Sequence, residues 1–72
     1  MTERQKEFLR ALADCGISIN TLIVVGSLIT TEPLMAEMCK RILKAEESGQ
    51  KVSDGLVGQV LIDMMNETMT EK

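Results

Sequence analysis

The feature that most constrains the fold is an uncharged stretch in the first half of the chain. From Cys15 to Thr31 the sequence contains no charged residue, and about half of its residues are aliphatic. A membrane-spanning helix needs about 20 predominantly apolar residues. This stretch is shorter and includes glycine, serine, asparagine and threonine. It therefore predicts an element that is buried within protein, and no membrane span.

Helix and strand compete for this stretch. Its β-branched residues favour a strand, and Gly26 weakens a helix by about 1 kcal/mol. A strand would need partners, however, and no other segment alternates between polar and apolar residues. Ser18 is a suitable N-cap, and Ile17 and Leu22 are spaced as a hydrophobic staple around it. The sequence therefore predicts a helix here.

Three further segments show apolar residues at helical spacing between recognisable ends. Thr2, Thr31 and Ser53 are N-cap residues, while Gly16 and Gly49 suit the left-handed turn that ends a helix. We predict an all-α fold class, a compact bundle of about four short helices that forms one domain over residues 1–72. The predicted helices are 3–15, 18–30, 32–48 and 54–69.

The energetics of so short a chain favour association with a second copy. A chain of 72 residues buries only about 60% of its unfolded surface, so burial barely offsets the entropy of ordering the chain. In the predicted helix 18–30, apolar residues cover about 220° of the helical wheel, far more than an ordinary stripe. Either the other three helices cover this helix well, or homo-oligomerisation completes the bundle. We favour a homodimer. Its predicted interface consists of Leu22, Val25, Gly26, Leu28, Ile29 and Ile62.

The charge and composition of the chain argue against several classes of binding partner and cellular location. Eight basic and eleven acidic residues give a net charge of −3, which argues against nucleic-acid binding through phosphate neutralisation. Phe8 is the only aromatic residue, so no platform exists for stacking bases. The charged start of the chain lacks the apolar core of a signal peptide. We therefore expect a cytoplasmic protein that binds neither nucleic acid nor membrane.

The residues that usually carry catalysis are missing. The sequence has no histidine, the commonest general acid–base group. Cys15 and Cys39 lie on or beside the predicted apolar faces, so they are interpreted as small buried hydrophobic residues. Two cysteines without histidine make no zinc site, and no glycine-rich phosphate loop is present. The sequence predicts a protein that is not an enzyme and has no catalytic residues, metal or cofactor.

One basic cluster has two interpretations. Near the end of the predicted helix 32–48, cations would complement the helix dipole and face the acidic last helix. The same side chains could instead form a site for an anion or a protein partner. The cluster consists of Lys40, Arg41, Lys44 and Lys51.

These observations lead to two hypotheses for function. The first is a small, non-catalytic helical interaction protein that self-associates and binds a protein partner as an inhibitor, adaptor or regulator. The alternative is an oligomeric sequestering protein for a small anionic ligand such as a nucleotide, held by the basic cluster and by helix N-termini at Ser18 or Ser53.

Overall fold

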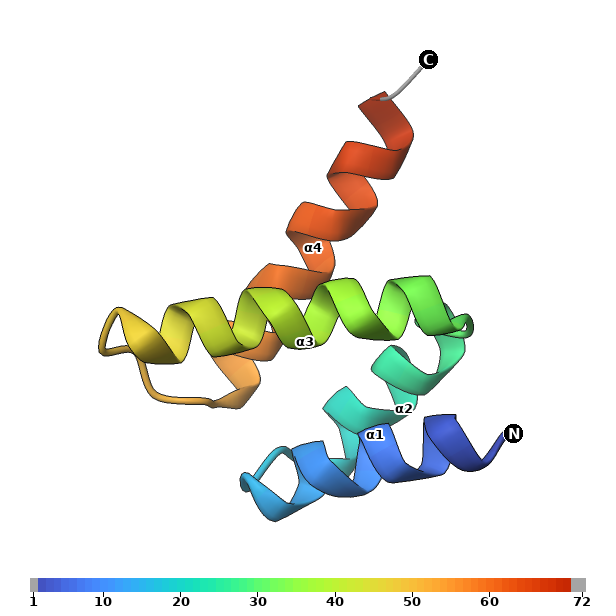
Figure 1. Cartoon of the computed structure of the whole chain (residues 1–72), viewed down its shortest axis with the longest axis horizontal. Helices are drawn as coiled ribbons and strands as arrows, with labels where there is room; N and C mark the ends of the chain where they lie inside the picture. The colour runs from blue at the N-terminus through green and yellow to red at the C-terminus, as the bar shows by residue number, and fades with distance from the viewer. Residues whose placement is uncertain (1, 71–72) are drawn as a thin grey trace.

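Four helices account for most of the chain (Figure 1). The structure is a computed structural model that describes residues 2–70, and the side chains of residues 2–67. Each helix begins within one residue of its predicted start and ends within two residues of its predicted end. The helices are α1 (Glu3–Asp14), α2 (Ile19–Leu28), α3 (Glu32–Glu47) and α4 (Asp54–Thr70).

The helices begin where hydroxyl side chains satisfy the free backbone N–H groups. The Thr2 hydroxyl accepts a hydrogen bond from the Gln5 N–H at 3.2 Å, and Gln5 Oε1 accepts one from the Thr2 N–H at 3.1 Å. This is the predicted capping box. The hydroxyls of Ser18, Thr31 and Ser53 each accept from the backbone N–H three residues further on, at 3.3 to 3.4 Å. The caps therefore determine where the helices start.

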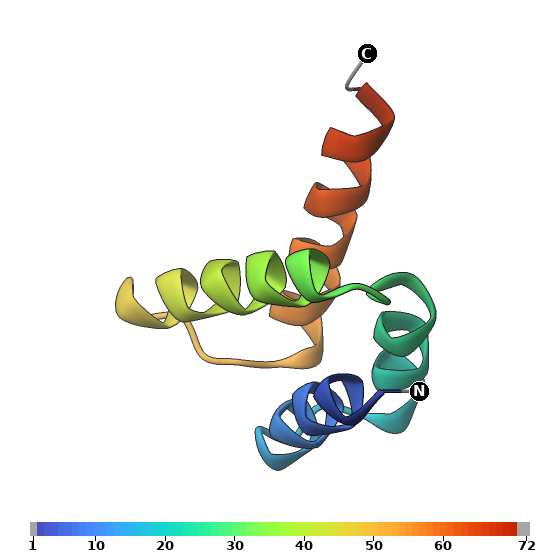
Figure 2. The ribbon, with the colours of Figure 1, turned by 45° about the vertical axis from the view of Figure 1, so that its right-hand side comes forward.

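The helices form a flattened body from which one helix projects. α1 and α3 run in the same direction, and α2 contacts both α1 and α4 (Figures 1 and 2). α4 crosses α3, and its second half extends beyond the other helices. The principal dimensions are 36 × 31 × 19 Å. The radius of gyration is 11.7 Å, close to the value of about 11 Å expected for a compact chain of this length.

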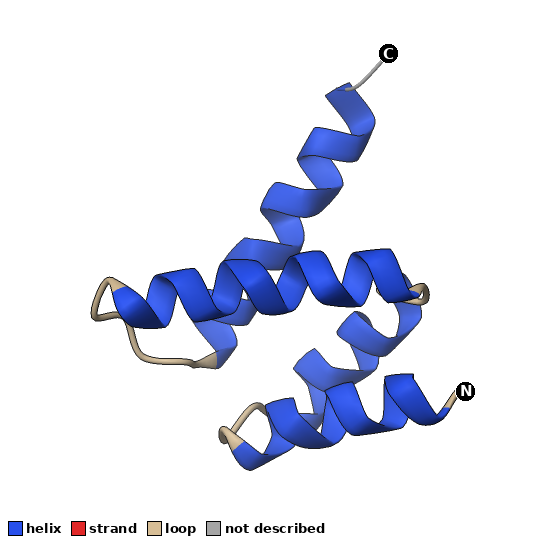
Figure 3. Cartoon of the chain, viewed as in Figure 1, coloured by secondary structure: helices blue, strands red, loops and turns tan. Residues whose placement is uncertain are grey.

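The all-α prediction is confirmed. Over residues 2–70 the structure contains helices, turns and loops, and no strand (Figure 3). No helix within these residues is long and apolar enough to cross a membrane.

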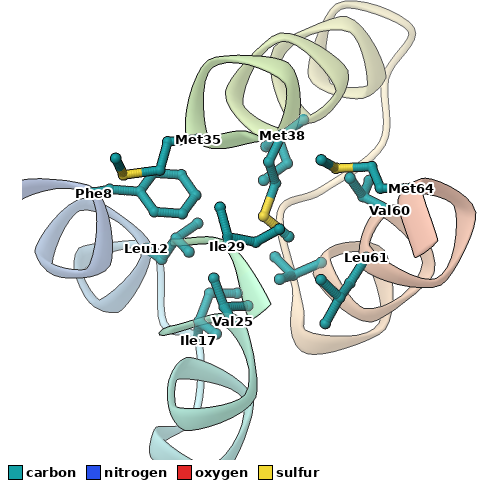
Figure 4. Close-up of a cluster of buried hydrophobic side chains, with 12 residues drawn as sticks. Phe8, Leu12, Ile17, Val25, Ile29, Met35, Met38, Val60, Leu61 and Met64 are labelled. Carbon is teal, nitrogen blue, oxygen red and sulfur yellow. The ribbon is translucent and has the colours of Figure 1, made fainter. Parts of the chain in front are cut away.

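The core lies where the inner faces of all four helices meet (Figure 4). Met38 of α3 and Ile29, just after α2, occupy its centre, and the ring of Phe8 lies beside Met35. No side chain among residues 2–67 is both polar and buried. The remaining core side chains are Leu12, Ile17, Val25, Ile42, Val57, Val60, Leu61 and Met64.

The structure corrects the prediction that both cysteines are buried. Cys15, the C-cap of α1, and Cys39 of α3 are both exposed. The buried stripe of α3 contains only Met35, Met38 and Ile42, and it leaves out Cys39, which was predicted to lie on or beside the apolar face. The reason is that α1 and α3 make the sparsest contact of the helix pairs that touch, so one side of α3 stays open.

Candidate interaction surfaces

The orientation of α2 differs from the one that the sequence analysis predicted. Val25 is fully buried and Ile29 is 2% exposed, so both belong to the core of the chain itself. A Cβ atom added at Gly26 would lie 3.4 Å from Leu9 Cδ1, which places this glycine against α1. Leu22 is half-buried against the core. These four residues were predicted to contact a second copy, but in the single chain this side of the helix faces the core and α1.

Leu28 and Ile62, the other two predicted interface residues, lie on the surface. Leu28 is 41% exposed and Ile62 is 55% exposed. Val24, one turn before Leu28, lines a hollow of about 330 Å³ between α2 and α4 together with Ile62. The other residues that line this hollow are Asn20, Thr21, Gly58 and Leu61.

The exposed side of α2 extends this apolar surface toward α1. Ile19 is 73% exposed and Ile23 is 60% exposed. They follow each other by one helical turn, whereas Val24 lies about 100° further round the helix, beyond the exposed Asn20 and Ser27. We call the combined surface the α2–α4 face. It consists of Ile19, Ile23, Val24, Leu28 and Ile62.

A second apolar surface lies between α1 and α3. Two hollows of about 280 and 180 Å³ adjoin there, and both are lined by Phe8, Ala11 and Cys39. We call the pair the α1–α3 groove. Arg4 lies at one end of it and Cys15 at the other. The remaining lining residues are Glu7, Leu12, Met35, Ala36, Ile42, Leu43, Glu46 and Val52.

Both thiols of the protein therefore face one groove, although they are 24 positions apart in the sequence. Partial burial raises the pKa of the Cys39 thiol, and the charge of Arg4 offsets this by a smaller amount. Within the described part of the chain, no three histidine, cysteine, aspartate or glutamate side chains are grouped as a metal site requires.

The basic cluster does not act as one unit. The Arg41 guanidinium donates to Glu37 on its own helix at 2.7 Å and to Glu67 of α4 at 2.6 Å. The hydrogen bonds to Glu67 and Glu37 raise the pKa of Arg41, and the bond from Arg41 lowers the pKa of Glu67. Arg41 is thus a link between α3 and α4. Lys40, Lys44 and Lys51 are exposed, and none has an ion pair within residues 2–67.

A carboxylate already occupies one of the helix N-termini considered for an anion. Asp54 Oδ1, in the first turn of α4, accepts a hydrogen bond from the Ser18 N–H at 2.8 Å. The contacts with Ser18, its backbone N–H first, lower the pKa of the Asp54 carboxyl. Arg41 and the α2 N-terminus are each engaged within the chain. Neither is therefore free to bind a small anionic ligand, as the second hypothesis requires.

Comparison with protein-family models, with curated proteins and with solved structures finds no match to this chain. Its function therefore has to be argued from the surfaces themselves. These are two separate apolar surfaces, one between α1 and α3 and the other on α2 and α4, and α2 carries no charged residue.

Proposed function

We propose that this protein is a non-catalytic interaction protein, which forms a homodimer through the α2–α4 face and binds another protein as an inhibitor, adaptor or regulator. The observation that carries the proposal is the α2–α4 face itself. It presents five large aliphatic side chains to solvent, and no charged residue interrupts α2. Contiguous apolar surface of this kind is a common mark of protein–protein contact.

The total surface of the chain supports association. The chain exposes 5064 Å², whereas a compact monomer of 8.0 kDa is expected to expose about 4,450 Å². The excess reflects the flattened shape and the projecting half of α4. Closing a second copy over the α2–α4 face would bury apolar area that the fold leaves open, and two-fold pairing would place the same face on both subunits.

Sedimentation equilibrium at micromolar concentration tests the homodimer. We expect the wild type to have twice the chain mass of 8.0 kDa. Ile62→Glu should sediment as a monomer, because it would bury an unpaired charge at the contact. Leu43→Glu is the matched control: Leu43 is 57% exposed but lies on α3, outside the face. A wild-type mass near that of one chain, or dissociation of Leu43→Glu, would contradict the proposal.

Affinity capture tests the partner. We expect a stoichiometric protein from a lysate of the native source to be retained by the wild type and identified by mass spectrometry. Circular dichroism of the same preparations shows whether each variant used for comparison is folded. Failure to retain any protein at stoichiometric yield would leave self-association as the whole of the function and would contradict the partner-binding half of the proposal.

A further inference from the structure

We infer that the α1–α3 groove binds an amphipathic helix of a partner protein, and that this helix carries acidic side chains along the edge that faces α3. The inference deepens the proposed function, because it assigns the partner to a site and a chemistry. It concerns other helix faces than the homodimer does, so the two can fail separately.

The shape of the groove fits a helix. α1 and α3 run in the same direction (Figures 1 and 2), and the two hollows between them adjoin end to end. From Arg4 to Cys15 the groove follows about 16 Å of α1, at 1.5 Å per residue. That length matches about three turns of a bound helix. The floor is made of Phe8, Ala11 and Leu43 with their neighbours, which suits apolar anchors at spacings of three and four residues.

The charged residues at the α3 edge indicate which charge a bound partner helix carries along that edge. Lys40 and Lys44 lie one turn apart and line a shallow hollow together with Leu43 and Glu47, so that two cations and one acid lie at this edge. Neither lysine has an ion pair within residues 2–67, whereas Arg41 on the same helix has two. Acidic residues spaced by four on a bound helix would meet this pair of lysines. Arg4 adds a third cation at one end of the groove.

The groove also has acidic residues, which limit where the partner's acids can lie. Glu7 is on the α1 side near Arg4, and Glu46 is at the end near Cys15. Glu47 lines the hollow of Lys40 and Lys44, so the partner's acids must lie beside these lysines and away from the α3 C-terminus. The partner's acidic edge must therefore face Lys40 and Lys44 rather than α1.

A second copy of this chain is a poorer occupant than a partner helix. α2 has no charged residue and so cannot provide the acidic edge. The described acids on the outer part of α4 are engaged in their own chain, because Asp63 accepts from Gln59 at 3.0 Å and Glu67 accepts from Arg41.

The two native thiols allow a direct test. The probe is a synthetic amphipathic helix of about 14 residues, with leucines at spacings of three and four and two glutamates four positions apart on one edge. A control peptide has lysines in place of these glutamates. We measure alkylation of Cys15 and Cys39 by N-ethylmaleimide, using mass spectrometry. The acidic peptide should slow both reactions several-fold and should bind about tenfold tighter than the control, the effect expected of two exposed ion pairs.

Variants of the protein test where the peptide binds and which charge the peptide must carry. Leu43→Glu should abolish protection of the thiols, and the double variant Lys40→Glu/Lys44→Glu should bind the lysine peptide better than the acidic one. Lys51→Glu is the matched control: it makes the same charge change in the loop before α4 and should leave binding unchanged. Far-ultraviolet circular dichroism verifies that each variant remains folded.

Three outcomes would overturn the inference. Equal protection by the two peptides would show apolar binding without charge recognition, and no protection would show that no helix binds. If Leu43→Glu lowers the sedimentation mass of the protein, a second copy occupies the groove. If Ile62→Glu sediments as a monomer but its thiols are still protected by the acidic peptide, both proposals stand independently. If the wild type is a monomer that the peptide protects, only the homodimer fails.

Discussion

At the scale of single residues, Asp54 joins two helices that are far apart in the sequence. Its carboxylate lies in the first turn of α4, where the helix dipole favours negative charge. It also accepts the Ser18 N–H at the start of α2, at 2.8 Å. One side chain thus stabilises the N-termini of two helices, and the residues concerned are 36 positions apart. No local pattern in the sequence could have predicted this contact.

The lowered pKa of Asp54 predicts how stability depends on pH. A carboxyl whose pKa is lower in the folded protein stabilises the fold above its unfolded value, and the stabilisation is lost as pH falls through the folded value. The usual value is 3.8. Asp54→Asn should therefore lower the urea midpoint at pH 7, and the difference from wild type should shrink as the pH falls below 3.8.

The control for this prediction is Asp63→Asn on the same helix. The Asp63 carboxylate accepts only from Gln59, one turn away on α4, at 3.0 Å, so its replacement should change the urea midpoint much less. At low pH, protonation of Glu67 removes its ion pair with Arg41 in all three proteins. The resulting loss of stability is the same in each, so it cancels when their urea midpoints are compared. A difference between wild type and Asp54→Asn that stays constant from pH 7 to below the usual aspartate pKa would contradict the assignment.

Two isoleucines at the ends of α2 test which side of the helix faces inward. Ile29 is 2% exposed and Ile19 is 73% exposed. Ile29→Val should destabilise the protein by about 0.5–1.5 kcal/mol, because it removes a buried methylene. In the Ile62→Glu background, where no second copy covers the α2–α4 face, Ile19→Val should stay within about 0.5 kcal/mol of its parent variant. Urea unfolding measures both variants. Equal costs would show that the two ends of α2 are similarly buried.

At the scale of helices, the sequence predicts where elements begin better than which side they bury. Side chains that cap a helix act within three residues, so the starts could be predicted from Thr2, Ser18, Thr31 and Ser53. The orientation of α2 could not be predicted, because aliphatic residues occupy nearly every side of it. The neighbouring helices select the buried side, and they place Val25 inward and Ile23 outward.

For the candidate surfaces too, features set by neighbouring residues could be predicted, and features set by the packing of distant helices could not. Leu28 and Ile62 could be predicted as surface residues of an apolar face, since they lie outside the narrow stripes that one core can cover. The α1–α3 groove could not be predicted, because it depends on how far α1 stands from α3. Helical spacing alone placed Cys39 among the buried residues, whereas it is exposed.

Two glycines test the roles of particular helical positions. Gly58 is inside α4, and a Cβ atom there would meet nothing within 4 Å in a single chain. In the Ile62→Glu background, which should be monomeric, Gly58→Ala should stabilise the protein by up to about 1 kcal/mol through helix propensity. Gly16 has φ +90°, so Gly16→Ala should instead destabilise it by about 1 kcal/mol or more. Thermal unfolding monitored by circular dichroism measures both changes. A loss of stability in Gly58→Ala would show an unsuspected contact at that position.

At the scale of the whole molecule, the core explains why a second copy would stabilise the fold. Among residues 2–67, twelve hydrophobic residues are buried, and the five aliphatic side chains of the α2–α4 face are exposed in the single chain. The stability of a small chain with so limited a core is expected to be marginal. Burial of the α2–α4 face would therefore couple folding to association.

That coupling predicts a melting temperature that depends on protein concentration. When folded dimers unfold to separate chains, mass action favours the folded state at higher concentration. From the typical unfolding entropy per residue, Tm should rise by about 5 °C for each tenfold increase in concentration. Scanning calorimetry over a hundredfold concentration range should show this rise for the wild type and for Leu43→Glu. Ile62→Glu should melt at one temperature throughout, because its chains unfold singly. A wild-type Tm that does not change with concentration would mean that folding gains nothing from a second copy.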